Sequence, residues 1–186
     1  MMRRSLMAVL AVGVVAQIGC ASEVMVYEPG YPQRYSTGEF FYAARGGEMR
    51  VDVRGNPFAM PPERFADRVL TDMAGATRGP NVNFTTSPSG AGSEPYRVVM
   101  LFNAGPAAFG DDACAETAGP ISPVGNRLTL LSVFCNGDVA LTESSGWAYG
   151  VAGPDDAKFR KLVRAVALAL IPTHEDIGDG DSTIPN

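Results

Sequence analysis

The chain has 186 residues, of which 46% are hydrophobic, and its formal net charge at pH 7 is −5. This length is enough for one domain that buries its own hydrophobic core. The acidic balance argues against nucleic acid as a partner and against electrostatic docking on anionic lipid.

The amino-terminal segment has the organisation of a secretory signal peptide. Two arginines form a basic start, an almost unbroken apolar run covers residues 6–15, and the small residue Gly19 directly precedes Cys20. The apolar run is too short to span a bilayer as a mature helix, so we expect residues 1–19 to be removed on export. Because this segment carries two basic and no acidic residues, its removal takes the net charge from −5 to −7.

The motif Gln17-Ile18-Gly19-Cys20 resembles the lipobox of bacterial lipoproteins, although Gln17 stands where that family usually carries leucine or another aliphatic residue. The resemblance implies that Cys20 receives a diacylglyceryl group, that cleavage occurs before it, and that the new amino terminus is acylated. Two or three acyl chains anchor a protein stably, whereas one chain binds a membrane only marginally. The resemblance therefore implies a lipid-anchored protein of the cell envelope.

The residues around Cys20 also bear on the choice of membrane. By the same resemblance, Ser22 rather than aspartate after Ala21 favours the periplasmic face of the outer membrane over the inner membrane. The alternative is an ordinary signal peptide that is cut after Ala16 or Ala21, in which case Cys20 has no role in anchoring.

The other two cysteines are Cys114 and Cys135, an even number if Cys20 is lipidated. In the oxidising cell envelope we expect them to form a disulfide. This bond would close a loop of about 20 residues, which the chain-entropy model values at roughly 3 kcal/mol. Two free buried thiols and a metal site are the alternatives, but the chain has a single histidine, which makes a zinc site a poor interpretation.

Residues 20–38 are rich in tyrosine, proline and glycine, which predicts an extended tether between the membrane and the domain. The first two strands of the domain, over 39–44 and 48–54, are predicted to pair as a hairpin, because apolar and charged residues alternate along the second. In the first of them, Phe40 and Tyr42 would share a buried face.

Periodicity in the remaining chain predicts three further strands and two helices. The strands cover 96–102, 127–135 and 138–148, and the helices cover 62–75 and 155–171. The last two strands flank Asn136-Gly137, which is a strong hairpin signal because both turn residues tolerate positive φ.

The predicted order is β-β-α-β-β-β-α over a single domain, residues 39–172. We therefore expect an α+β fold, a small two-layer sandwich in which two helices pack on one face of a mostly antiparallel sheet. Residues 173–186 are acidic and rich in glycine, and they are expected to form a disordered tail.

The sequence has no recognisable catalytic set. Its single histidine, His174, lies in the predicted tail without a Gly-x-Ser-x-Gly elbow, so a solvated tail residue is the favoured interpretation. Carboxylates occur as sequence neighbours, which do not face each other across a cleft. Asp176, Asp179 and Asp181 lack the spacing of an EF-hand calcium loop. We expect a protein that is not an enzyme and has no cofactor or metal site.

Three functions are compared on this basis. The favoured hypothesis is a structural or protein-interaction component of the envelope, which contacts another envelope protein through the sheet edge and the loops 80–95 and 104–126. The alternative is a small-ligand or glycan binding module that uses aromatic residues. Trp147 and Tyr149 are candidates for it, although burial is their favoured role. The third hypothesis is a carboxylate-based hydrolase whose acids meet only in the folded chain.

Overall fold

The computed structural model describes residues 24–30, 34–89, 94–120 and 125–173. Within these ranges, six strands form one sheet and four helices pack around it, which confirms the predicted mixture of helices and a sheet. In chain order the elements are β1 (Val24–Gly30), α1 (Thr37–Ala43), β2 (Glu48–Arg54), α2 (Pro62–Met73), β3 (Asn83–Thr85), β4 (Tyr96–Phe102), α3 (Gly110–Cys114), β5 (Arg127–Asn136), β6 (Val139–Tyr149) and α4 (Ala157–Leu170).

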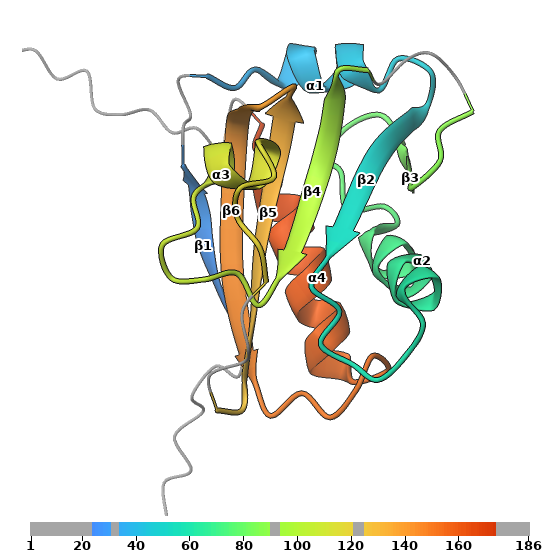
Figure 1. Cartoon of the computed structure of the whole chain (residues 1–186). Coiled ribbons are helices and arrows are strands. Elements are labelled where there is room, and N and C mark those ends of the chain that lie inside the picture. The colour runs from blue at the N-terminus through green and yellow to red at the C-terminus, as the bar shows by residue number, and fades with distance from the viewer. Residues whose placement is uncertain (1–23, 31–33, 90–93, 121–124, 174–186) are drawn as a thin grey trace, which may run out of the picture.

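The strands lie in the order β1-β6-β5-β4-β2-β3. The first four of these pair antiparallel with one another, whereas β2 runs parallel to both of its neighbours, β4 and β3. Helices α2 and α4 cover one face of the sheet, α1 lies across one end, and α3 lies on the opposite face (Figure 1). The face that carries α3 is called the α3 face below.

The main core fills the space between the sheet and the helices α2 and α4. The predicted apolar stripes of both helices are buried, including Phe65 on α2 and Phe159 on α4. Their ring centroids lie 4.9 and 5.7 Å from that of Phe102 on β4. Burying each of these side chains contributes about 1.5–3 kcal/mol, so the cluster holds both helices on the sheet.

A smaller core lies on the α3 face, beneath α3. Val99 and Val133 are fully buried there against Ala113 and Cys114. Cys114 forms a disulfide with Cys135 of β5, and their Cα atoms are 5.7 Å apart. The predicted pairing is therefore confirmed, and it ties a helix of five residues to the middle of the sheet.

The predicted β5–β6 hairpin is also confirmed. Asn136 pairs with Val139, and Gly137 in the turn has a φ of 57°, a conformation that glycine adopts without steric cost. Helices α2 and α4 begin and end within the predicted ranges 62–75 and 155–171.

The predicted first strand, residues 39–44, is wrong, because this segment belongs to helix α1. The Ser36 hydroxyl accepts a hydrogen bond from the Glu39 amide at 3.0 Å and caps the helix. Phe40 is buried and Tyr42 is 58% exposed, so the two aromatic residues do not share a face. The predicted hairpin partner, β2, pairs with β4 and β3 instead.

The sheet begins earlier than the sequence predicted. Strand β1 lies inside the segment assigned to the tether, 20–38, and Val24 pairs with Ala148 of β6, so the expected domain start at residue 39 is too late. The run Val-Met-Val-Tyr that opens β1 favours a strand and alternates between the two faces of the sheet, with Val24 buried and Tyr27 exposed. The strand propensity of these four residues therefore determines the local structure, although a proline and a glycine follow them.

Two predicted loops also contain regular structure. Helix α3 lies in the loop 104–126 and β3 in the loop 80–95. With α1 in place of the predicted first strand, the described chain therefore has four helices rather than two, and the pairing of β2 with β4 and β3 makes its sheet partly parallel. The predicted signal peptide, Cys20 and all of the predicted tail except Thr173 lie outside the described residues. No helix in the described ranges is both long enough and apolar enough to cross a membrane.

Candidate binding groove

The α3 face of the sheet carries a groove of about 400 Å³ over β5 and β6. Thr129, Leu131, Ser145 and Trp147 line it from the two strands, and residues 103–109, which lead from β4 into α3, line it from the side. In the pairing of β5 with β6, Thr129 lies opposite Trp147, and Leu131 lies opposite Ser145.

The alternation of side chains along β6 produces this lining. Every second residue from Glu143 to Trp147 faces the groove, because successive side chains of a strand point to opposite faces. The residues between them face α4, where the Ser144 hydroxyl donates to the Val166 carbonyl oxygen at 2.7 Å. A Cβ atom at Gly146 would lie 2.9 Å from the Val166 side chain, so a glycine is needed for α4 to pack this closely.

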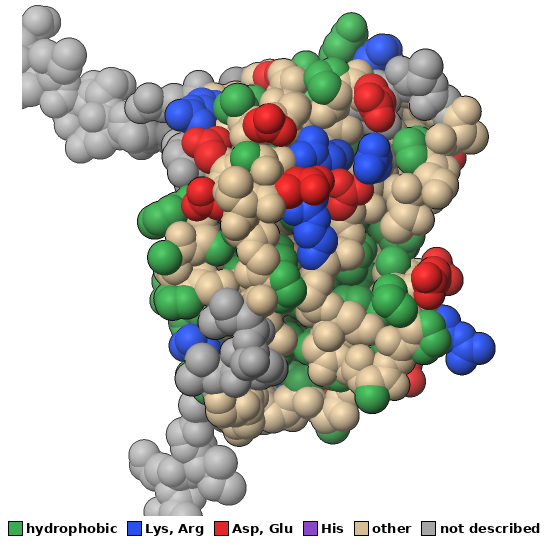
Figure 2. All heavy atoms as spheres, in the orientation of Figure 1, with side chains coloured by type: hydrophobic (Ala, Val, Ile, Leu, Met, Phe, Trp, Pro, Cys, Tyr) green, Lys and Arg blue, Asp and Glu red, His purple; other side chains and the backbone are tan. Residues whose placement is uncertain are grey.

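Exposed aromatic side chains continue the groove towards β1. The ring centroids of Tyr27 and Trp147 are 4.9 Å apart, and the Arg127 guanidinium carbon lies 6.0 Å from the Trp147 centroid. Tyr27 is 55% and Tyr149 47% exposed, so the expected burial is wrong for Tyr149 and only partial for Trp147. Figure 2 shows hydrophobic side chains gathered along this flank, at the left of the view.

Two carboxylates hold α3 against β6 at one end of the groove. Glu143 of β6 accepts a hydrogen bond from the Gly110 amide at 2.6 Å, and Asp111 of α3 accepts one from the Ala140 amide at 2.8 Å. Burial raises the pKa of Glu143, Asp111 adds to the rise, and the Gly110 hydrogen bond opposes it. The Ala140 hydrogen bond and an ion pair with Arg34 lower the pKa of Asp111.

Near the other end, Asn103 lines the groove, and its buried side-chain oxygen has no hydrogen-bond partner among the described residues. Asn103 is 5% exposed, and its backbone amide donates to the Thr129 carbonyl oxygen at 2.8 Å. A buried polar atom without a partner costs about 1–3 kcal/mol. This oxygen is therefore a ready acceptor for a donor group of a bound molecule or of water.

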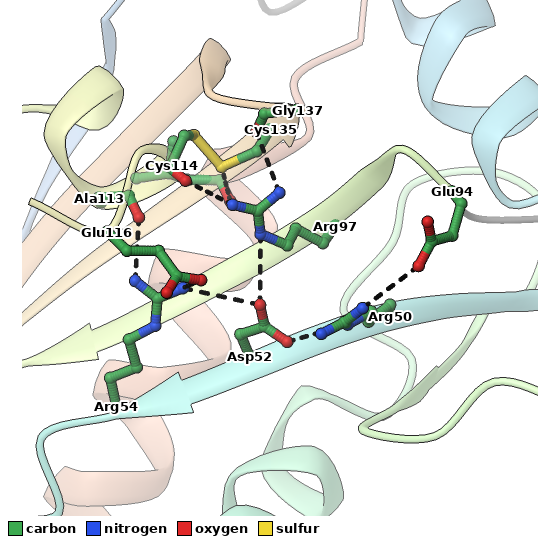
Figure 3. A network of polar contacts seen from close by, with 11 residues as sticks. Arg50, Asp52, Arg54, Glu94, Arg97, Ala113, Cys114, Glu116, Cys135 and Gly137 are labelled. Carbon is green, nitrogen blue, oxygen red and sulfur yellow. Dashed lines mark hydrogen bonds and ion pairs between the residues drawn. A yellow bond between two sulfur atoms is a disulfide. The ribbon is translucent and has the colours of Figure 1, made fainter.

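A polar cluster lies at the carboxyl end of α3, outside the groove lining (Figure 3). The Asp52 carboxylate of β2 lies 3.3 Å from the Arg97 guanidinium and 3.7 Å from that of Arg54. Arg97 also donates to the carbonyl oxygens of Cys114 and Gly137, so it joins α3 to the β5–β6 turn. The cluster is completed by Arg50, Glu94 and Glu116. Each charge of this cluster has a partner of opposite sign, so the cluster offers no free charge to a ligand. Its contacts with α3 support a structural role.

The residues proposed from the sequence are distributed unevenly around the groove. The disulfide does not line the groove, and of the described part of the loop 104–126 only the segment 104–109 does. The described residues 80–89 of the loop 80–95 lie at the opposite edge of the sheet, around β3 (Figure 1). Cys20 and His174 lie outside the described residues. Within the part of the chain that the structure describes, no group of three or more histidine, cysteine, aspartate or glutamate side chains could hold a metal ion.

Sequence reasoning missed most of the groove residues on β5 and β6, including Arg127 and Glu143, and it also missed Asn103. The alternation along the predicted strand 138–148 does place Glu143 and Trp147 on one face. It does not indicate that this face stays open, since that depends on where α3 docks.

Comparisons with known proteins supply no relative for this chain. No protein-family model matches it, and neither a curated protein nor a solved structure matches it. The groove and the amino-terminal motif are therefore the features of this chain that bear on its function.

Proposed function

We propose that this protein is a lipid-anchored lipoprotein of the cell envelope, and that its domain binds another molecule through the groove without catalysis. The proposed anchor is Cys20, on the periplasmic face of the outer membrane or, alternatively, on the inner membrane. The observation that carries the proposal is an open groove with aromatic side chains and an unpartnered buried oxygen, that of Asn103. Concave sites with a few convergent polar groups are where proteins bind ligands.

The short chain between the proposed anchor and the sheet supports a domain held close to the membrane. Val24, the first residue of β1, is four residues beyond Cys20, and four residues span at most about 14 Å. Met25, the second residue of β1, lies opposite Trp147 in the β1–β6 pairing. The aromatic end of the groove therefore lies at the end of the sheet where the chain from Cys20 enters β1. We therefore favour a partner that itself resides in the envelope, such as another envelope protein.

Two other functions have a specific observation in their favour. The exposed rings of Tyr27 and Trp147 could stack on a glycan or a small ligand, which is the main alternative. Glu143 and Asp111, whose pKa values move in opposite directions, would be the residues of a carboxylate-based hydrolase. Both of these carboxylates, however, accept backbone amides across the contact of α3 with β6, which supports a structural role for them.

Photo-crosslinking in cells tests the binding surface. A photoreactive amino acid at Ser145, in the groove, should capture a partner that mass spectrometry identifies. The same group at Lys161, exposed on the outer side of α4, serves as the matched control and should capture none. Equal capture at both positions, or no capture at Ser145, would contradict the proposal.

Metabolic labelling with a palmitate analogue tests the anchor separately. The wild-type protein and a Ser22→Ala control should incorporate the label, because the cysteine remains, whereas Cys20→Ala should not. An unlabelled wild-type protein, or equal labelling of Cys20→Ala, would show that Cys20 is not the anchor.

A further inference from the structure

The groove carries two opposite charges that no described residue neutralises. Glu143 accepts a hydrogen bond from the neutral Gly110 amide, and the charge that acts on it is the negative one of Asp111. Arg127 contacts the Trp147 ring, and none of the ion pairs within the described ranges includes it. A bound molecule can therefore gain an ion pair at each end of the groove.

The two charges are too far apart to neutralise each other. The Arg127 guanidinium lies beside Trp147, which is four residues from Glu143 along β6, and four residues of strand span about 14 Å. Leu131 and Ser145 line the groove between them. A molecule that pairs with both charges must be extended, with a cationic and an anionic group on the order of 14 Å apart.

The Asn103 side-chain oxygen gives a third indication of the kind of ligand that fits the groove. The Asn103 side-chain oxygen lies near the Arg127 end, since the Asn103 amide donates to Thr129, the residue opposite Trp147. As an acceptor without a partner among the described residues, it favours a ligand that carries an N–H or O–H donor over one that leaves the position to water. An extended peptide supplies amide donors along its length, an ammonium group at one end and a carboxylate at the other. Four residues of such a chain span at most about 14 Å.

We propose that the groove binds a short extended peptide of about four residues, with its ammonium group on Glu143 and its carboxylate on Arg127. Phe109, which precedes Gly110 and is 59% exposed on the rim, adds an aromatic ring at the ammonium end, where such a ring attracts a cation. A neutral glycan would leave both charges unpaired. The inference rests on the proposed function, because it takes the groove as the binding surface, and it places a short free peptide of the envelope there in place of a whole envelope protein.

The single tryptophan of the chain makes the test direct. Trp147 lines the groove, so its fluorescence reports binding there. Tetra-alanine with free ends is titrated into the full-length lipoprotein in detergent, in parallel with tetra-alanine acetylated at its amino end and tetra-alanine amidated at its carboxyl end. We expect saturable binding of the free peptide and roughly tenfold weaker binding of each blocked peptide, because hydrogen bonds between charged groups are the strong ones.

Protein variants assign each end of the peptide to its residue. Glu143→Gln should bind the free and the acetylated peptide equally while still discriminating against the amide. Arg127→Met should show the reverse pattern, and Lys161→Gln should match the wild type. Thermal unfolding establishes that each variant is folded. If Glu143→Gln does not fold because the contact with Gly110 is weakened, the affinities of the wild-type protein for the three peptides still show whether both charged ends of the peptide contribute to binding.

The outcomes separate this inference from the proposed function. Equal affinity of the wild-type protein for the three peptides, or no change in fluorescence up to about 10 mM peptide, overturns the peptide assignment. Binding of a neutral chitooligosaccharide in place of the peptides also overturns it, while capture of a partner at Ser145 in cells would still support the groove as a binding surface.

Discussion

The Cys114–Cys135 disulfide should stabilise the fold by about 3 kcal/mol, because it closes a loop with a sequence separation of 21 residues. Domains have a total stability of about 5–15 kcal/mol, so the reduced protein should remain folded. After reduction, Arg97 and the amide contacts of Asp111 and Glu143 still hold α3. In urea, where the free energy of unfolding falls by about 1–3 kcal/mol per molar denaturant, the midpoint should drop by roughly 1–3 M.

Unfolding of the full-length protein in detergent, followed by Trp147 fluorescence with and without reductant, measures this drop. The double variant Cys114→Ala/Cys135→Ala should unfold near the midpoint of the reduced wild-type protein, and reductant should not shift it further. If mass analysis confirmed the bond and reduction moved the midpoint by less than about 0.3 M, the loop-closure reasoning would be refuted.

Three further substitutions test the packing and the electrostatics by the same urea assay. Phe159→Ala should lose about 3–5 kcal/mol, because the ring is fully buried, whereas Lys161→Ala should stay within about 0.5 kcal/mol. Gly110→Ala should lose about 1–3 kcal/mol, because its Cβ would lie 2.8 Å from the Ala140 Cβ as well as 2.6 Å from the Glu143 carboxylate, whereas Gly119→Ala meets no atom within 4 Å; equal losses would contradict this packing. Burial raises the pKa of Glu143 above its ordinary value of 4.5, so the folded state binds this proton more tightly than the unfolded state, and stability falls as the pH rises from 4.5 through the raised pKa. Glu143→Gln should therefore gain stability relative to the wild type over this range, and a difference in midpoint that does not change with pH would contradict the assignment.

Sequence periodicity predicted the elements whose apolar stripe packs on the sheet. Phe65 and Phe159 mark the buried faces of α2 and α4, and Asn136-Gly137 marks the β5–β6 hairpin. Helix α1 was mispredicted because seven residues contain only about two turns, which is too short to separate a helical period from an alternating one. The signal that identifies this helix is the cap at Ser36, which lies outside the predicted strand 39–44.

The candidate site was predictable only in part. Alternation along β6 places Glu143 and Trp147 on one face from sequence alone. Which part of that face remains open depends on contacts between residues far apart in the chain, such as that of Asp111 with Ala140. The local sequence around α3 gives little helical signal, so neither the position of the groove wall nor the missing partner of Asn103 could be read from it.

The contacts that position α3 also shape the proposed binding groove. A helix of five residues is not stable in isolation, and here the disulfide, Arg97 and two carboxylates hold it on the sheet. Phe109, on the groove rim, directly precedes this helix, so the wall depends on the same contacts. A disulfide forms in an oxidising compartment, which the proposed envelope location supplies. Reduction removes one of these contacts and leaves Arg97 and the two carboxylates to hold a less rigid α3, so it should weaken the binding of tetra-alanine while β5 and β6 remain folded. An unchanged affinity would show that the groove wall does not depend on the disulfide.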